Sequence, residues 1–224
     1  MTAKTQGIVV ALLAAVLVRL ALTGEYLRFV LPWMRWPLLV TGLVLLVMAI
    51  RPALGLGGSA ERVPWPTWLL VLPVLIVFAV APPPLGAYLA ERRSAQPPPR
   101  PASPSVVRVH HGRGPVDLGL DEFTWGAAQP DDVMGLTDAT VRIEGFVSTD
   151  HQGGWYLTRL VIFCCAADAV VERIKILGHP APPRDQWVRV TGVWVAGTGA
   201  DPATPPEMTA TEVVDLPPPK NPYG

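Results

Sequence analysis

The stretch Val141–Val147, which reads VRIEGFV, places an apolar residue or glycine at alternate positions. Such alternation is typical of a β-strand with one buried face. Because glycine lets a strand bend sharply, short strands with a glycine in the first and in the fourth predict a small all-β domain, an OB-like barrel. Another small antiparallel β-domain is the alternative. The four further strands are predicted at Trp155–Cys165, Val170–Leu177, Trp187–Val195 and Met208–Leu216.

The predicted strands belong to an acidic soluble domain, which we place at residues 105–224. This half of the chain carries nine Lys and Arg residues against fifteen acidic residues, so its formal net charge is −6. Binding to a phosphate backbone relies on Lys and Arg, and the charge therefore disfavours nucleic acid as a partner. Ahead of the strands, Asp121–Met134 predicts a short helix that is interrupted at Pro130.

The N-terminal region, residues 1–93, has the composition of a membrane region. It contains three apolar stretches of nearly the length needed to cross a bilayer, at about residues 7–23, 29–50 and 67–90. We therefore expect three transmembrane helices in a multi-pass protein of the cell membrane, in contact with the lipid bilayer. A Ser/Pro-rich stretch at 94–104 predicts a semi-rigid linker to the soluble domain. The positive charges that flank the helices do not assign the side of the membrane on which that domain lies.

Two arginines interrupt the first two apolar stretches, namely Arg19 and Arg35. An arginine close to a helix end normally extends its charged head to the lipid headgroups. The alternative is contact with a partner helix or a polar path, since buried intramembrane charge is costly and usually functional. Both arginines are therefore candidates for contact with a partner inside the membrane.

The chain has two cysteines, and they stand side by side as Cys164 and Cys165. If the strand that contains them stays extended, their side chains point to opposite faces and cannot bind one metal ion. One cysteine would then be a small buried hydrophobe, and the other would lie near the rim. A bulge or turn at Cys-Cys-Ala-Ala would instead bring both thiols to one side, with Asp168 as the nearest further metal ligand.

Spacing alone gives a weak signal for a metal site. No CxxC or HxxxH motif joins the cysteines to a histidine, and the simpler role for Asp168 is to cap a turn just after them. The chain also shows no Gly-rich phosphate loop, nucleophile elbow or paired carboxylates, so we expect a protein that is not an enzyme. We expect no cofactor, with a transition-metal ion at Cys164, Cys165 and Asp168 as the alternative. The four histidines are His110, His111, His151 and His179.

Two motifs stand out in the N-terminal half: Tyr26–Pro32, YLRFVLP, and Pro82–Gly86, PPPLG. Together with the signature residues of the soluble domain, they resemble the YcgQ-type family of bacterial membrane proteins. The resemblance implies a membrane protein that serves as a permease subunit, with a multi-pass permease of the YcgR type as its partner. It brings no established catalytic residues. The signature residues in the soluble domain are Gly145, Phe146 and Val147, then Cys164, Cys165, Ala166, Ala167 and Asp168.

From these observations we expect an accessory subunit of a membrane transport complex. Its tethered OB-like domain would sense, gate or present substrate to the permease. A second hypothesis is a membrane-tethered metal- or thiol-binding sensor or chaperone that uses Cys164 and Cys165. A third is a module that binds sugars or lipid headgroups, because four aromatic residues of the strands could stack on a ligand: Trp155, Tyr156, Trp187 and Trp194.

Overall fold

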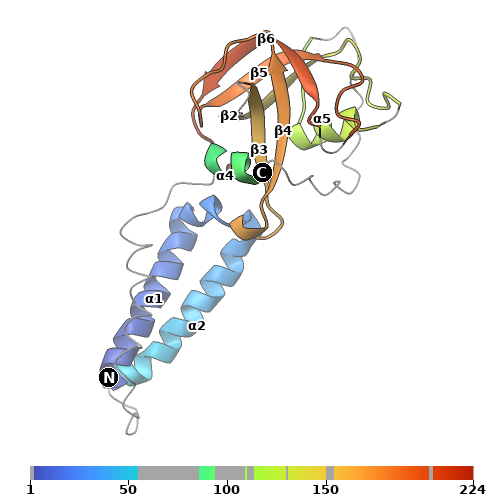
Figure 1. The fold of residues 1–224 in the computed structure, drawn as a ribbon. Coiled ribbons are helices and arrows are strands. Elements are labelled where there is room, and N and C mark those ends of the chain that lie inside the picture. Colours follow the sequence, from blue (N-terminus) through green and yellow to red (C-terminus); the bar gives the residue numbers. More distant parts are fainter. Residues whose placement is uncertain are drawn as a thin grey trace. The chain divides into compact units, whose positions relative to one another are not determined.

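The computed structural model describes residues 3–54, 86–93, 109, 114–129, 131–149, 154–201 and 204–223. The chain divides into two compact units, Met1–Pro84 and Leu85–Gly224 (Figure 1). This boundary precedes the Pro-rich stretch 94–104, and the predicted linker there lies outside the described residues.

The described part of the N-terminal unit, residues 3–54, is a helical hairpin. Its two helices pack so closely that a side chain at Gly42 would come within 2.8 Å of the Val18 side chain. Gly24 opens the connection with a φ of 78°, a left-handed conformation that glycine adopts without strain. The elements of the hairpin are α1 (Ala3–Thr23), the 3-10 turns η1 (Glu25–Arg28) and η2 (Pro32–Met34), and α2 (Arg35–Ala53).

One helical stretch among the described residues, Pro32–Ile50, is long and apolar enough to cross a membrane, and Gly7–Thr23 is a shorter apolar helix. The expected three transmembrane helices are therefore not shown. The third predicted stretch, 67–90, lies outside the described residues as far as residue 85. Its last residues are part of helix α4 (Ala87–Arg93), which packs against the sheet of the C-terminal unit.

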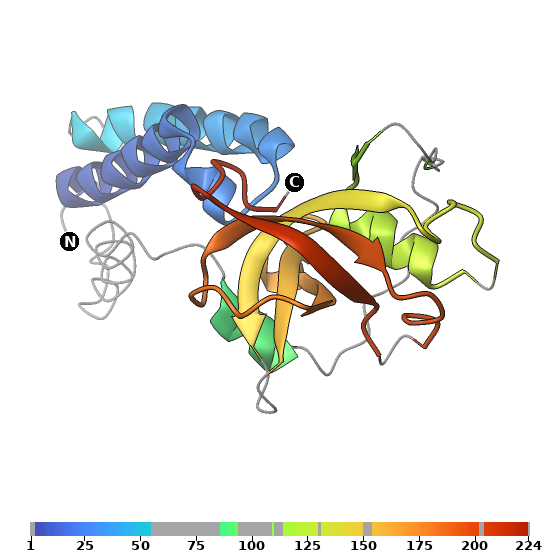
Figure 2. The same ribbon diagram turned by 90° about the horizontal axis from the view of Figure 1, so that it is seen from above.

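The C-terminal unit is built on a mixed sheet of six strands, with the order β1-β2-β3-β4-β6-β5. Strand β2 also pairs with β5, so the pairings from β2 through β3, β4, β6 and β5 return to β2 (Figures 1 and 2). The pairs β1–β2 and β4–β6 are parallel and the others are antiparallel. The strands are β1 (Val116–Asp117), β2 (Thr140–Thr149), β3 (Trp155–Val161), β4 (Val170–Leu177), β5 (Trp187–Trp194) and β6 (Glu207–Leu216).

All five predicted strands are present, and β1 is additional. The alternative of a purely antiparallel domain is wrong, because β4 and β6 run in parallel. The predicted short helix is α5 (Leu120–Ala127), which packs against β4 and β2 and buries Phe123 in the core. Its first turn is closed by Glu122, whose carboxylate accepts a hydrogen bond from the Gly119 N–H at 2.9 Å.

The two strand glycines, which were predicted to mark points of bending, lie where neighbouring strands approach closely. A Cβ atom at Gly145 of β2 would lie 2.7 Å from the carbonyl oxygen of Thr158 in β3. At Gly192 of β5 it would collide with the carbonyl oxygen of Thr209 in β6, and the β5–β6 register shifts between Thr191 and Gly192. These close approaches allow β2 and β5 to curve and to pair on both sides.

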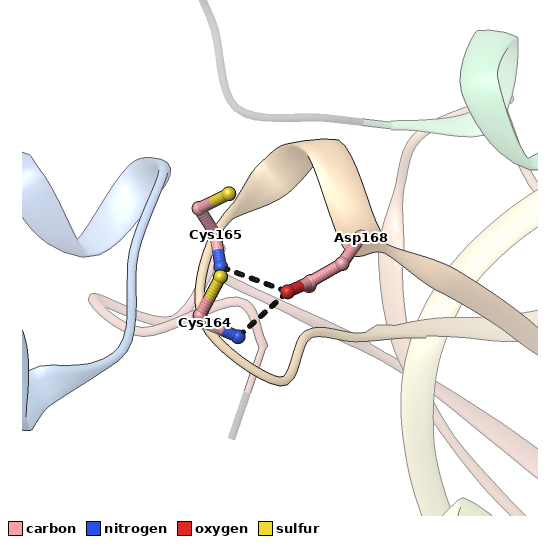
Figure 3. Close-up of side chains that lie close together, drawn as sticks. All are labelled: Cys164, Cys165 and Asp168. Atoms are coloured by element: carbon pink, nitrogen blue, oxygen red, sulfur yellow. Dashed lines mark hydrogen bonds between the residues drawn. The ribbon is translucent and has the colours of Figure 1, made fainter.

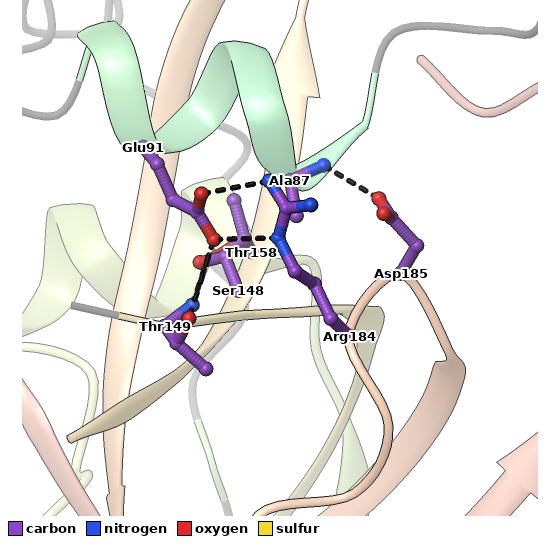
Figure 4. A network of polar contacts seen from close by, with 7 residues as sticks. All are labelled: Ala87, Glu91, Ser148, Thr149, Thr158, Arg184 and Asp185. Atoms are coloured by element: carbon purple, nitrogen blue, oxygen red, sulfur yellow. Dashed lines mark hydrogen bonds and ion pairs between the residues drawn. The ribbon is translucent and has the colours of Figure 1, made fainter. Parts of the chain in front are cut away.

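Helix α4 is fixed by polar contacts to β2 and to the loop before β5 (Figure 4). At its start, the Ala87 N–H donates a hydrogen bond to the Asp185 carboxylate at 2.6 Å. Further along, Glu91 receives two parallel hydrogen bonds from Arg184, at 3.0 Å and 2.7 Å, and one from the Thr149 N–H at 3.3 Å. The side chains of Ala87 and Ala90 are buried. The chain segment that precedes the Pro-rich stretch is thus an integral part of the C-terminal unit.

Candidate functional site

The two cysteines lie on a turn between β3 and β4, not in a strand. β3 ends at Val161, and the short 3-10 helix η4, Ala166–Asp168, reverses the chain before β4 begins at Val170. The predicted continuation of the strand to Cys165 is therefore wrong, and the alternative of a turn is confirmed. Cys164 is exposed and Cys165 is half-buried, so neither is the buried small hydrophobe of the simplest prediction.

Asp168 holds this turn together (Figure 3). Its carboxylate accepts hydrogen bonds from the backbone N–H groups of Phe163 at 2.9 Å, of Cys164 at 2.8 Å and of Cys165 at 3.3 Å. The predicted capping role of Asp168 is therefore confirmed. Alanines at 166 and 167 leave the turn free of bulky side chains. Because three backbone donors converge on one carboxylate, the turn has a defined shape without any ligand.

The Asp168 carboxylate also lies close to the thiol of Cys164, with their ligand atoms within 4.8 Å of each other. Interaction with this carboxylate, and then with Cys165, raises the pKa of the Cys164 thiol to about 12. The interaction with Cys164, together with the backbone donors, lowers the pKa of Asp168. At neutral pH the site therefore contains a carboxylate and a protonated Cys164. A thiol of this kind is a poor nucleophile, since the thiolate is the reactive form.

The ligand atoms of Cys164, Cys165 and Asp168 all lie within 4.8 Å of one another. In a tetrahedral zinc site with Zn–S bonds of about 2.3 Å, two sulfur atoms lie roughly 3.8 Å apart. Two thiolates and a carboxylate are a donor set that suits Zn²⁺ and similar thiophilic ions. The residues present therefore fit a metal ion with three protein ligands.

Comparison with known proteins places this turn inside a domain family. Residues 131–224 match the DUF1980 C-terminal domain. The matched segment contains β2 to β6 and the cysteine turn, and it spans less than half of the chain. It supports membership of this domain in an uncharacterised family, while the YcgQ-type resemblance of the whole chain stays a prediction. No curated protein matches the chain.

The other signature residues of the domain serve the fold. Phe146 packs against Trp187, with ring centroids 5.8 Å apart, and Val147 is fully buried in the core. Val147 also exchanges backbone hydrogen bonds with the loop before β5: its N–H donates to Gln186 and its carbonyl accepts from Asp185. Gly145 permits the close approach of β2 and β3. None of these three residues takes part in the hydrogen bonds that Asp168 accepts in the cysteine turn.

The histidines do not complete the metal-ligand group within the described part of the chain. His179 lies there, and its ring contacts the carbonyl oxygen of Pro180 at 2.8 Å; it is not a member of the cysteine group. The other three predicted candidates, His110, His111 and His151, lie outside the described residues.

The arginines that interrupt the apolar stretches lie at the connected end of the hairpin. Arg19 is in the last turns of α1 and lies 3.7 Å from Glu25, and both side chains are substantially exposed. Arg35 is the first residue of α2. The structure therefore gives Arg19 a partner on its own chain, and it places Arg35 at a helix end, where arginines reach the headgroups.

The four aromatic residues predicted to stack on a ligand mostly pack within the domain. Trp155, Tyr156 and Trp187 are buried, and Trp194 is half-buried. The indole N–H of Trp155 donates to the His179 carbonyl oxygen at 2.9 Å, and that of Trp194 donates to Thr198 at 3.2 Å. An aromatic platform for sugars or headgroups is therefore not formed by this set.

Glu172 of β4 is a buried carboxylate that was not among the predicted site residues. It has an exposed fraction of 5%, and its side chain lies 3.3 Å from the hydroxyl of Thr124 in α5. Burial, and then the negative charge of Asp121, raise the pKa of Glu172 to about 7. The sequence of β4 does indicate that Glu172 is buried. Alternate residues of a strand share a face, and Glu172 therefore lies on the same face as the core residues Ile174 and Ile176.

Proposed function

We propose that this protein is a membrane-associated module that binds a thiophilic metal ion through Cys164, Cys165 and Asp168. The observation that carries the proposal is the convergence of two thiols and one carboxylate within 4.8 Å on a single turn. Such convergence requires the chain to turn sharply at the cysteines, since an extended strand would separate them. The proposed role is binding of an ion, not catalysis.

The scaffold of this module would be an OB-like barrel. In support, five strands pair in the closed circuit β2-β3-β4-β6-β5-β2, and β4–β6 is the parallel pair of that circuit. The close approaches at Gly145 and Gly192 supply the bending that a small barrel needs. Fold alone assigns no ligand, so the metal proposal depends on the turn and not on the barrel.

Membrane association is supported by the apolar surface of α2. Large hydrophobic side chains are exposed on this helix, among them Trp36 at 69% and Met48 at 66%. Trp33 and Trp36 lie at its N-terminal end, where interfacial aromatic residues anchor a membrane helix. We propose that the hairpin is inserted in the bilayer and tethers the C-terminal unit to it.

The metal proposal is tested with the full chain in mild detergent, reduced and freed of metal under anaerobic conditions. Titration with Co²⁺ is expected to give thiolate-to-metal charge-transfer absorption that saturates at one ion per chain. The double variant Cys164→Ser/Cys165→Ser should lose this absorption, while Asp215→Asn, an exposed carboxylate on β6, should keep it. Absence of the absorption from the unaltered chain, or its persistence in the double variant, would overturn the proposal.

A second candidate function is that of an accessory subunit of a transport complex, with a multi-pass permease of the YcgR type as partner. The exposed apolar side chains of α2 favour it, because they offer a surface for another membrane helix as well as for lipid. Co-purification of such a permease with the tagged chain in gentle detergent is the expected result. Loss of the permease on washing under conditions that keep the hairpin intact would count against it.

A further inference from the structure

Resting on the proposed metal site, we propose that its ion is handed directly to the thiol or imidazole ligands of a second protein. The site would then be a transfer site and not a store or a structural centre.

The cysteine turn supplies three ligands, and a tetrahedral ion has four positions. Among the described residues, the group that could hold an ion consists of Cys164, Cys165 and Asp168 alone. Structural zinc sites are normally closed by four protein ligands, whereas sites with three protein ligands keep one position open to another molecule. An ion held by this turn would therefore present an open position to an incoming ligand.

The open position would be within reach of another protein. Cys164 is exposed, and the adjacent Phe163 has an exposed fraction of 61%, although Ile162 just before it is buried. The turn thus leaves the body of the domain at Phe163 and carries the thiols on its surface. Aromatic side chains are enriched where proteins meet, and Phe163 would border the contact.

The turn would not depend on the ion for its shape. Its backbone is held by the three hydrogen bonds that Asp168 accepts from residues 163, 164 and 165. Many small zinc domains unfold when their ion leaves, because binding of the ion supplies the folding free energy. Here the core and the strands are formed independently, so the ion can leave without unfolding the domain.

The transfer itself is an exchange of ligands without oxidation or reduction. An incoming thiol gives its proton to solvent as its sulfur bonds to the ion at the open position. The bonds from the ion to Cys165, Cys164 and Asp168 would then be replaced one at a time by bonds to further thiols of the acceptor. Each further thiol would release its proton to solvent, and each departing thiolate would take up a proton. The ion passes to the acceptor with its charge unchanged.

The mechanism is tested by the kinetics of transfer from the full chain loaded with Co²⁺ in detergent. The acceptor is a metal-free synthetic peptide with four cysteines in two CxxC motifs, mixed in excess over a range of concentrations. Direct transfer predicts an observed rate constant that rises in proportion to the acceptor concentration. A rate constant that does not change with acceptor concentration would mean that the ion first dissociates, and would overturn the inference.

Failure of the inference and failure of the metal site are distinguished by the loading step. A chain that binds Co²⁺ but releases it at a rate independent of acceptor retains the proposed site and loses the transfer role. A chain that does not bind Co²⁺ overturns both. The variant Asp215→Asn is the matched control, and its transfer rate should equal that of the unaltered chain.

Discussion

The carboxylate of Asp168 interacts with Cys164 twice: it accepts a hydrogen bond from the backbone N–H of Cys164 at 2.8 Å, and it lies within 4.8 Å of the thiol of the same residue. One acidic side chain therefore sets both the position and the protonation of this cysteine. A purely structural cap would need only the first contact. The second contact places a negative charge beside a sulfur atom, which makes the metal-free site favourable for cations and unfavourable for thiolate chemistry.

This arrangement predicts slow alkylation of Cys164 in the metal-free chain. Interaction with the Asp168 carboxylate raises the pKa of the thiol from its usual 9.0 to about 12, so little thiolate is present near neutral pH. The rate of modification by iodoacetamide is measured in a Cys165→Ser background, so that only Cys164 reacts. This rate should continue to increase at pH values above the pKa of an ordinary thiol, where the rate for an ordinary thiol no longer changes. Mass spectrometry of the modified peptide measures the rate.

The variant Asp168→Asn tests the cause of this low reactivity. Asparagine keeps an oxygen that can accept backbone N–H groups but removes the negative charge, so modification near pH 8 should become several times faster. The control Asp215→Asn should leave the rate unchanged. A Cys164 that reacts at the same rate with and without the Asp168 charge would contradict the prediction.

The contacts around α4 predict that Glu91 and Arg184 stabilise its docking together. Their two parallel hydrogen bonds form a fork, but both side chains are partly exposed, so a coupling free energy of only about 1 kcal/mol is expected. A double-mutant cycle with Glu91→Gln and Arg184→Gln, followed by chemical denaturation, measures this coupling. Hydrogen exchange of the amides in 88–93 should become faster in each single variant.

Asp185→Asn is the matched variant at the other end of α4. Asp185 has a φ of 65°, a left-handed conformation that asparagine also tolerates, so the loop should keep its shape. The loss of the charged acceptor for the Ala87 N–H should nevertheless speed exchange in α4. If exchange in α4 is unaffected by all three variants, the polar contacts do not hold the helix and the burial of Ala87 and Ala90 does.

The strands of the C-terminal unit could be predicted from sequence because each has a regular pattern of its own. VRIEGFV alternates over one strand, and its glycine marks the place where β2 approaches β3 closely. The helix α4 could not be predicted in this way, since Ala87–Arg93 follows an apolar stretch and its partners, Arg184 and Asp185, lie more than 90 residues further along the chain. Contacts at such separation leave no local pattern.

The cysteine site shows the same limit. The sequence placed Cys164, Cys165 and Asp168 close together along the chain, and it left open whether the backbone is extended or turned there. The turn is decided by the hydrogen bonds of the Asp168 carboxylate to three backbone groups, which compete with continuation of β3. Asp168 was predicted as a cap, but its influence on the Cys164 thiol required the geometry of the turn.

Gly145 is predicted to be essential for the stability of the domain. A Cβ atom there would lie 2.7 Å from the Thr158 carbonyl oxygen and 3.1 Å from the side chain of Leu157, both of which are firmly packed. Gly145→Ala should therefore lower the free energy of unfolding by about 1–3 kcal/mol, the usual cost of overpacking. Thermal unfolding followed by circular dichroism measures the change, and an unchanged midpoint would show that β2 and β3 can separate without cost.

Glu172 predicts how the stability of the C-terminal unit depends on pH. Its pKa rises from 4.5 to about 7 on folding, so between these values the folded state binds more protons than the unfolded state. Stability is therefore expected to fall as the pH rises through this window, by about 3 kcal/mol in total, because a shift of one unit corresponds to about 1.4 kcal/mol. Above pH 7 the Glu172 carboxylate is charged while it is buried near Asp121, and the stability of the folded unit decreases no further through this group.

The variant Glu172→Gln isolates this contribution. Glutamine can keep the contact with the Thr124 hydroxyl but carries no titrating group, so the decrease between pH 4.5 and 7 should be reduced, and the variant should be more stable than the unaltered chain above pH 7. Urea denaturation at a series of pH values measures both effects. Glu212→Gln, an exposed acidic residue on β6, is the control and should retain the original pH dependence. Equal pH profiles for Glu172→Gln and the unaltered chain would mean that Glu172 titrates normally in the folded domain and that its burial is relieved by water.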